Sequence, residues 1–512
     1  MSGYEEPAVP PPAGPFTEAR VRYFALEALL AGAEARSGRH DEVEELIDRH
    51  GREVLRALFQ GHLDLRAREE ERADPPPVGA DGVTRTRTER GHDRRLVSQF
   101  GQVTVSRHAY RAAGVGNLHP ADAALNLPAG LYSHTLARRL ALEVTRGSFG
   151  DAVDAVARAT GQVLGKRLAV ELVRGLAADV DAFYAQARPE VSPAGRLLVL
   201  QFDGKGIVMR PEALRPATAK AAGAATHRLS TRLSPGEKAN RKRMAEIAVV
   251  HDITPAPRTV DDVIARRPRS KAGADETPQP RADGPKATGK WLTASVVDDI
   301  ATVITAGFDE AERRDPHHQR TWVVLVDGNN TQIEAIRTEA TRRKAAVTIV
   351  VDFVHVLEYI WTAAWSFFDK GDPDAEDWVH AQARGVLAGR ANAIASGFRR
   401  RATRNHYNAT ERKGADTAAD YLDAKASYLR YDLALANGWP IATGVVEGSC
   451  RHLVKDRFDI TGARWGLDGA EAVLLLRAVV TNGDFDAYWA YHLDQEQHRN
   501  HHSKFAETYT PT

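Results

Sequence analysis

Three apolar runs in the sequence end on an aspartate. The runs are "LVLQFDGKG", "WVVLVDGNN" and "VTIVVDFVH", and the aspartates are Asp203, Asp327 and Asp352. Short β-branched runs are typical of strands buried on both faces, and groups at the ends of parallel strands converge on one edge of a sheet. Carboxylates gathered there repel one another unless a cation shares them, which favours Mg²⁺ or Mn²⁺. The alternative for any one aspartate is a simple turn.

A further acid, Glu447, precedes a helical pattern in "GVVEGSCRHLVKDRFDITGARW". Arg451 and Lys455 follow it at steps of four, so all three side chains are expected on one helix face. Glu447 could then complete a metal site while the two bases bind phosphates. The alternative is a surface ion pair, which contributes a few tenths of a kcal/mol.

Composition limits the classes of protein that need to be considered. With 512 residues, of which 43% are hydrophobic and 27% charged, the chain is expected to be globular, with three or four domains. Its one cysteine, Cys450, excludes an intramolecular disulfide and favours a reducing cytoplasm. The sequence contains no secretion signal and no long apolar run, so no membrane association is expected. Since the net charge is +1, nucleic acid would have to be bound by local basic patches.

One such patch lies in residues 80–115, where alternating residues predict a β-hairpin that turns near Gly101. Arg94, Arg95 and Arg107 belong to a series of arginines in this hairpin. These side chains either contact DNA phosphates or form an ordinary solvated surface, and the pattern leaves both alternatives open.

Residues 116–190 have a helical pattern that includes two helices joined by a short turn. Ser148 is expected to cap the first helix, and Gly161 is expected to end it. This outline matches a helix-turn-helix, although most helix pairs of this kind are ordinary packing.

Several longer stretches resemble the ISKra group of bacterial insertion-sequence transposases, which belong to the DDE class with a ribonuclease-H-like catalytic domain. The resemblance extends from about Arg196 to about Arg499, and its last block is long and specific. The matching stretches are "QFDGKG", "RKRMAEIAVVHDITP", "EAERRDP", "WVVLVDGNN", "VDFVHVLEYIW" and "WPIATGVVEGSCRHLVKDRFDITGARWGLDGAEAVLLLRAVVTNGDFDAYW".

The resemblance implies a catalytic site made of Asp203, Asp327 and Glu447. These acids would hold two Mg²⁺ or Mn²⁺ ions ~4 Å apart. The second acid is either Asp327 or Asp352, and Asp327 is preferred. The resemblance maps Asp352 and His355 to a (Cys or Asp)-x-x-His signature on the next strand, and they are expected to support the site.

The resemblance also implies a helical insertion ahead of Glu447. Its basic end contains Arg399, Arg400 and Arg401, which are expected to contact DNA phosphates together with Arg451 and Lys455.

The expected fold is an α/β catalytic domain with a ribonuclease-H-like mixed sheet and a helical insertion, preceded by a mainly α-helical DNA-binding region. The expected segments are 1–15, disordered; 16–75, helical; 80–115, basic hairpin; 116–190, helix-turn-helix-like; 195–366 and 440–485, catalytic domain; 367–439, helical insertion; and 486–512, C-terminal tail.

The expected function is that of a cytoplasmic, nucleoid-associated transposase that binds the terminal inverted repeats of its element and joins them to target DNA. A homo-oligomer on DNA is expected. Two alternatives remain open: a ribonuclease-H-like nuclease that lacks strand transfer, and a non-enzymatic DNA-binding regulator derived from an element.

Overall fold

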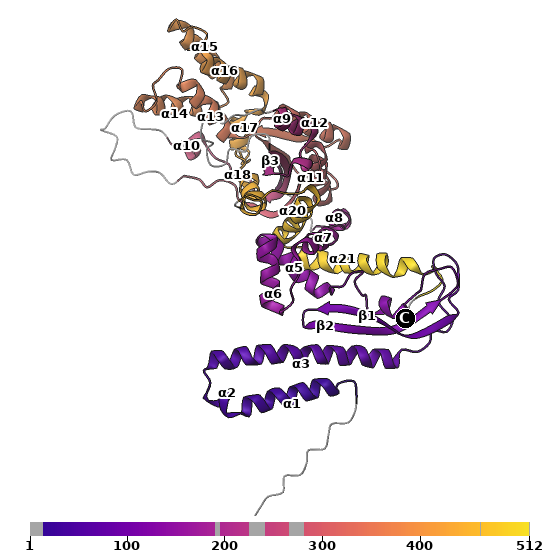
Figure 1. The fold of residues 1–512 in the computed structure, drawn as a ribbon. Helices are drawn as coiled ribbons and strands as arrows, with labels where there is room; N and C mark the ends of the chain where they lie inside the picture. Colours follow the sequence, from indigo (N-terminus) through magenta and orange to yellow (C-terminus); the bar gives the residue numbers. More distant parts are fainter. Residues whose placement is uncertain (1–13, 190–194, 225–240, 266–280, 461, 511–512) are drawn as a thin grey trace, which may run out of the picture. The chain divides into compact units, whose positions relative to one another are not determined.

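The structure, a computed structural model, describes residues 14–189, 195–224, 241–265, 281–460 and 462–510 (Figure 1). These residues form two compact units. The first contains the residues up to Phe183 and those from Asp484 onwards, and the second contains Tyr184–Gly483. The predicted disorder of residues 1–15 lies outside the described residues, except for the last two.

The first unit begins with a pair of long helices joined by a short one, and the second helix of the pair packs against a β-hairpin. The helices are α1 (Thr17–Ala31), α2 (Ala33–Ser37) and α3 (His40–Glu69). The hairpin consists of β1 (Arg87–Ser98) and β2 (Gly101–Arg111), which pair antiparallel. The pair Ser98–Gly101 closes its turn, which confirms the predicted hairpin. Leu63 of α3 packs with Leu96, Val103 and Val105 of the hairpin, and these apolar side chains form a core.

The remaining helices of this unit are short. They are α4 (Pro120–Ala124), α5 (His134–Arg146), α6 (Phe149–Thr160), α7 (Lys166–Leu176), the first part of α8 (Val180–Gln186) and α21 (Phe485–Asn500). As predicted, the Ser148 hydroxyl caps α6 by accepting from the backbone N–H of Asp151, and Gly161 ends the helix in the left-handed conformation. Residues 486–512, expected to be a tail, begin with α21. Its Tyr488 hydroxyl donates to the carbonyl of Leu176 over 2.6 Å.

The second unit is built on a five-stranded mixed sheet with the order β5-β4-β3-β6-β7. β3 pairs antiparallel with β4 and parallel with β6. β4 pairs antiparallel with β5, and β6 pairs parallel with β7. The predicted α/β domain is therefore confirmed. The strands are β3 (Leu197–Val208), β4 (Lys242–Ile253), β5 (Ala287–Ser295), β6 (Trp322–Val326) and β7 (Val347–Val351).

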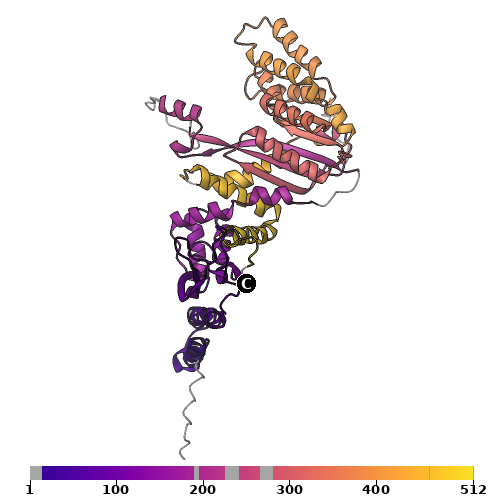
Figure 2. The ribbon, with the colours of Figure 1, turned by 90° about the vertical axis from the view of Figure 1, so that its right-hand side faces the viewer.

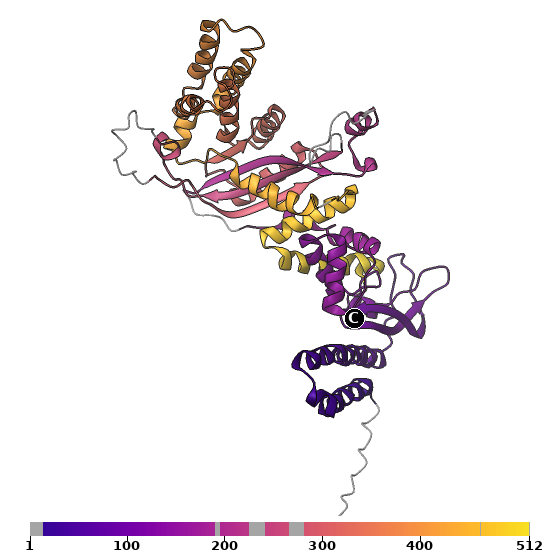
Figure 3. The same ribbon diagram turned by 60° about the vertical axis from the view of Figure 1, so that its left-hand side comes forward.

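Helices cover both faces of this sheet (Figures 2 and 3). On one face, Gly307 of α11 (Ile300–Arg314) lies so close to Phe202 that an added Cβ would approach the ring to 2.8 Å. Gln201, the residue before Phe202, points to the opposite face because side chains alternate along a strand. That face is occupied by α18 (Gly444–Ser449), whose Val446 N–H donates to Gln201. The π-helix η4 (Cys450–Lys455) and helices α19 (Asp456–Phe458) and α20 (Leu467–Asn482) continue from α18.

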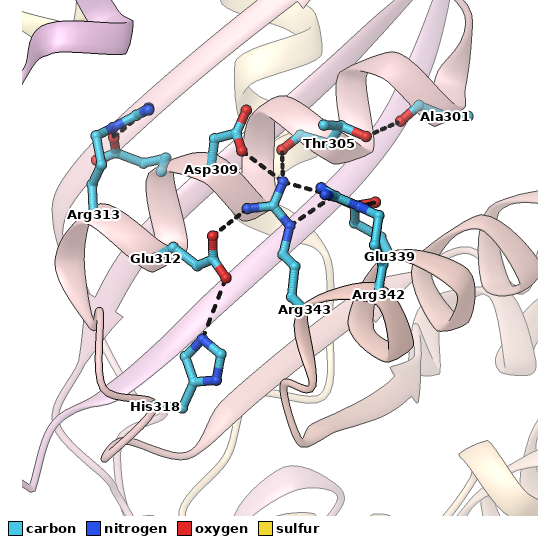
Figure 4. A network of polar contacts seen from close by, with 10 residues as sticks. Ala301, Thr305, Asp309, Glu312, Arg313, His318, Glu339, Arg342 and Arg343 are labelled. Atoms are coloured by element: carbon cyan, nitrogen blue, oxygen red, sulfur yellow. Dashed lines mark hydrogen bonds and ion pairs between the residues drawn. The ribbon is translucent and has the colours of Figure 1, made fainter.

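An arginine fixes α12 (Asn330–Arg343), the helix that follows β6, against α11 (Figure 4). Arg343 is almost fully buried, with 5% of its side chain exposed. Its guanidinium contacts Asp309 and Glu312 of α11 and Glu339 of its own helix. This network holds the C-terminal end of α12 against α11, whereas the start of α12 is capped by Asn329, two residues after Asp327.

The predicted helical insertion consists of helices, which project from the sheet of this unit (Figure 3). They follow α13 (Phe353–Ala364) and are α14 (Pro373–Leu387), α15 (Ala391–Arg404), α16 (Lys413–Lys425) and α17 (Tyr431–Ala436). Two short helices, α9 (Pro216–Ala224) and α10 (Val260–Val263), lie in the segments that flank β4. Throughout the described part of the chain, every helix is too short or too polar to span a membrane.

Candidate active site

The three aspartates occupy equivalent positions on neighbouring strands. Gln201 of β3 pairs with Leu325 of β6, so Asp203 and Asp327 each follow that pair by two residues. Val326 pairs with Val351 of β7, and the next residues are Asp327 and Asp352. The register therefore places the three aspartates in one row across the sheet.

The prediction that β3 ends on Asp203 is wrong. β3 continues to Val208, because β4 pairs with it as far as Lys242. What ends near Asp203 is the neighbouring strand β6, which stops at Val326. The carboxylate is half-buried at the place where the sheet loses one strand and β3 continues beside β4 alone.

A buried glutamine joins the row to the helix that carries Glu447. The backbone N–H of Val446 donates to the Gln201 Oε1 over 2.9 Å. The Gln201 Nε2 lies 3.1 Å from the His251 Nε2, and both side chains are buried. Because the amide oxygen already accepts from Val446, the amide NH₂ must donate to His251, whose Nε2 therefore has no proton. Burial lowers the pKa of His251 to about 4, which agrees with a neutral ring.

Thr443 bridges Asp352 and Glu447. Its hydroxyl lies 2.8 Å from the Asp352 Oδ2 and 3.0 Å from the Glu447 Oε1. The other oxygen of Asp352 accepts from the backbone N–H of Val354 over 3.0 Å and so caps α13. Asp352 is fully buried, and this burial raises its pKa. Both of its oxygens are used inside the protein, whereas Glu447 is exposed.

The other two carboxylates are more accessible. The Asp203 Oδ1 accepts from the backbone N–H of Gly204 over 2.7 Å, and its Oδ2 accepts from the Cys450 thiol over 3.2 Å. Burial raises the pKa of that thiol, and the charge of Asp203 adds to the effect, so the sulfur keeps its proton. Asp327 is half-buried, and its Oδ1 accepts from the backbone N–H of Asn329 over 2.8 Å.

His355 does not contact these acids through any hydrogen bond within the described residues. Its Nδ1 lies 3.1 Å from the Glu358 Oε2, one turn along α13, and 40% of the side chain is exposed. A supporting role for His355 therefore has to act through its charge, which lowers the pKa of Asp352 against the larger effect of burial.

Sequence reasoning missed an acid on the neighbouring strand. Glu246 of β4 pairs with Gly204, and burial raises its pKa, an effect to which the Asp203 charge adds. It also missed Gln201 and Thr443, which connect the acids. All three residues lie in stretches that carry the resemblance, but nothing in those stretches distinguishes them, because their roles depend on contacts between strands and helices that are far apart in the sequence.

The row of acids offers the hard oxygen donors that Mg²⁺ and Mn²⁺ prefer. In the part of the chain that the structure describes, no three histidine, cysteine or acidic side chains lie close enough together to hold a metal ion. Asp203 and Asp327 are half-buried and Glu447 is exposed, so the three carboxylates fit such an ion by their donor chemistry.

Two of the expected DNA contacts in the hairpin need correction. Arg107 is buried, and its guanidinium pairs with Asp122 and donates to the carbonyl of His92 over 2.6 Å. Arg94 donates to the carbonyls of Pro128 and Gly130. Both side chains hold the hairpin to the segment that follows it. Arg95 is exposed and has no hydrogen bond or ion pair within the described residues.

The arginines at the basic end of the insertion also include some that contact other side chains of the protein and some that are exposed. Arg399 pairs with Asp420 and Asp423, and Arg401 lies 4.6 Å from the ring centroids of Phe367 and Phe368. These two arginines have structural contacts, which their charge pattern did not reveal. Of the bases expected to contact DNA in the insertion and after Glu447, Arg400, Arg451 and Lys455 are exposed and have no ion partner within the described residues.

Comparison with protein-family models and with curated proteins finds no match to this chain.

Proposed function

We propose that this protein is a DNA transposase that binds the ends of a genetic element and catalyses metal-dependent cleavage and joining of DNA strands. The observation that carries the proposal is the row of Asp203, Asp327 and Asp352 on adjacent strands, joined through Thr443 to Glu447. The sheet order agrees with the ribonuclease-H-like domain that the resemblance implies, because β3 pairs antiparallel on one side and parallel on the other.

In this proposal Asp203, Asp327 and Glu447 hold two Mg²⁺ or Mn²⁺ ions. Such ions, when bound, activate a water or a DNA 3′-hydroxyl and stabilise the leaving oxygen. Thr443 and Gln201 fix the position of α18 and with it Glu447. Arg451 and Lys455, exposed after α18, would hold the phosphates of the bound strand.

The second acid of the site could be Asp327 or Asp352, and the surroundings of the two side chains support Asp327 as the metal ligand. Asp352 is fully buried, and its oxygens accept from Thr443 and from the backbone of Val354. Replacing these bonds by a metal ion would uncap α13. Asp327 is half-buried, and among the described contacts its second oxygen accepts no hydrogen bond. Asp352 therefore fits better as a positioning residue.

Recognition of the element's ends is assigned to the first unit, with Arg95 on β1 and helices α6 and α7 as the contact elements. The positive charge of exposed arginines attracts DNA without regard to sequence, whereas helix side chains in a groove can read it.

The metal requirement tests the proposal. Purified protein, mixed with DNA that carries the sequences flanking its coding region, is expected to release 3′-hydroxyl ends and to join them to target DNA in Mg²⁺ or Mn²⁺. Excess EDTA should stop both reactions. Undiminished cleavage in the chelator would contradict the proposal, and cleavage without joining would favour a nuclease.

A further inference from the structure

Helix α3 presents one exposed face along most of its length. Residues eleven apart in an α-helix are separated by about three turns, so Glu44, Leu55 and Arg66 lie in line. At the ideal helical rotation, Asp48 lies about 20° to one side of this line, and Gly51, Leu58 and His62 lie within about 60° of it on the other side. Beyond Asp48, Arg52 donates to the carbonyl of Ala159 and Phe59 packs against the hairpin core, so that side of the helix is covered. We call the whole set the α3 stripe: Glu44, Asp48, Gly51, Leu55, Leu58, His62 and Arg66.

The apolar middle of the stripe is not covered by the first unit. Leu55 and Leu58 are 45% and 43% exposed. The other sides of α3 are occupied, since Leu63 packs into the hairpin core and Gly61 lies against Pro15 and Phe16. Two exposed leucines one turn apart on an ordered helix provide an apolar patch that a partner could bury.

Gly51 has no evident role within its own unit. It lies in the interior of a 30-residue helix, where glycine costs ~1 kcal/mol relative to alanine. A Cβ at this position would meet no atom within 4 Å. The missing side chain therefore leaves space on the stripe, which allows the backbone of another helix to approach closely.

The charges of the stripe are arranged so that it can pair with itself. Its first turns carry Glu44 and its last turns carry Arg66, and neither has an ion partner within the described residues. If two copies of α3 cross antiparallel about Leu55, each Glu44 lies opposite the other copy's Arg66. A two-fold interface requires this kind of self-complementary surface.

We propose that two copies of the chain associate through their α3 stripes, antiparallel, with the two Leu55 side chains at the symmetry axis. The proposal goes beyond the proposed function and does not depend on DNA or metal. A second copy is favoured over an unrelated partner because each end of the stripe complements the opposite end of the same stripe.

Sedimentation of the full-length protein without DNA, over a range of concentrations, tests this proposal. The wild type should form a dimer. In the double variant L55E/L58E the dissociation constant of the dimer should rise about 10-fold or more, since a charge replaces each central apolar contact. The control is Glu45→Arg, which changes an exposed residue about 80° from the line through Glu44, Leu55 and Arg66 and should leave the dimer intact.

A charge swap tests the orientation. Glu44→Arg and Arg66→Glu should each weaken the dimer, and the variant with both changes should recover it, because the pair is restored with its signs reversed. Failure to recover would contradict the antiparallel arrangement. A wild type that stays monomeric at every concentration would overturn the proposal. If the wild type were monomeric and deletion of residues 1–13 produced a dimer, the occupant of the stripe in the full-length chain would be that segment and not a second copy.

Discussion

At the scale of single residues, the acids of the candidate site differ in what surrounds them. Asp352 is buried, caps α13 and accepts from Thr443, whereas Asp203 and Asp327 are half-buried at the end of β6. The sequence predicted that the three aspartates would gather, because each follows an apolar strand. The preference for Asp327 over Asp352 came from the resemblance. The apolar runs themselves could not rank the two, because the burial of Asp352 and its bond to Thr443 depend on the segment around α18, about ninety residues further along the chain.

The pH dependence of stability should depend on His251. Its pKa is about 4 in the folded protein, against about 6.5 in the unfolded chain. Between these values the unfolded chain binds a proton and the folded protein does not, so stability falls as the pH falls from 6.5 to 4. The variant His251→Gln keeps an acceptor for Gln201 but has no imidazole to protonate. Its free energy of unfolding should therefore fall by ~3 kcal/mol less than that of the wild type between pH 6.5 and 4. Denaturant unfolding at several pH values measures the difference, and equal slopes for both proteins would contradict it.

Removing the hydroxyl of Thr443 should destabilise the fold and reduce activity. In Thr443→Val the buried Asp352 Oδ2 loses its donor, and the free energy of unfolding should fall by ~1–3 kcal/mol. Thr443→Ser keeps the hydroxyl and serves as the matched control. Unfolding by denaturant and DNA cleavage should be measured on both variants. A valine variant as stable and active as the serine variant would show that the bridge to Glu447 has no function.

At the scale of elements, the sequence pattern predicted the type and the ends of helices and strands better than it predicted which contacts the charged side chains make. The hairpin turn and the Ser148 cap follow from local periodicity and capping, which the sequence records directly, whereas the helical insertion was implied by the resemblance. The arginines behaved differently. Arg107 and Arg401 have the same charge as their exposed neighbours, and only a folded partner, Asp122 or the Phe367 ring, distinguishes them.

This difference predicts opposite effects for two arginines of the hairpin. Arg95→Ala should weaken DNA binding and reduce the salt dependence by about one unit, while leaving stability unchanged, because the side chain is exposed. Arg107→Ala should instead lower stability, because it leaves Asp122 without its buried partner. Binding titrations at several salt concentrations and thermal unfolding measure both effects. If Arg95→Ala and Arg107→Ala were both folded and lost DNA binding equally, the assignment of Arg95 to DNA and of Arg107 to the protein interior would be contradicted.

At the scale of the whole molecule, the chain combines a unit with a helical pair and a hairpin with a second unit that carries the row of acids. The long-range pairing of β3 with β6 brings together residues more than a hundred positions apart. The apolar character of both runs indicated that they were buried strands. Their order in the sheet, and the continuation of β3 beyond Asp203, depend on β4 and could not be predicted from either run alone.

The central claim is that Asp203, Asp327 and Glu447 form a metal-dependent site for cutting and joining DNA. One cleavage assay should compare Asp203→Asn, Asp327→Asn, Glu447→Gln and Asp352→Asn, each at DNA-binding levels matched to the wild type. The first three substitutions remove a charge that would hold the metal ions but keep the shape, so they should abolish cleavage and joining without impairing binding. Asp352→Asn should retain part of the activity or lose stability. An active Asp327→Asn beside a folded but inactive Asp352→Asn would contradict the assignment and move the second ligand to Asp352.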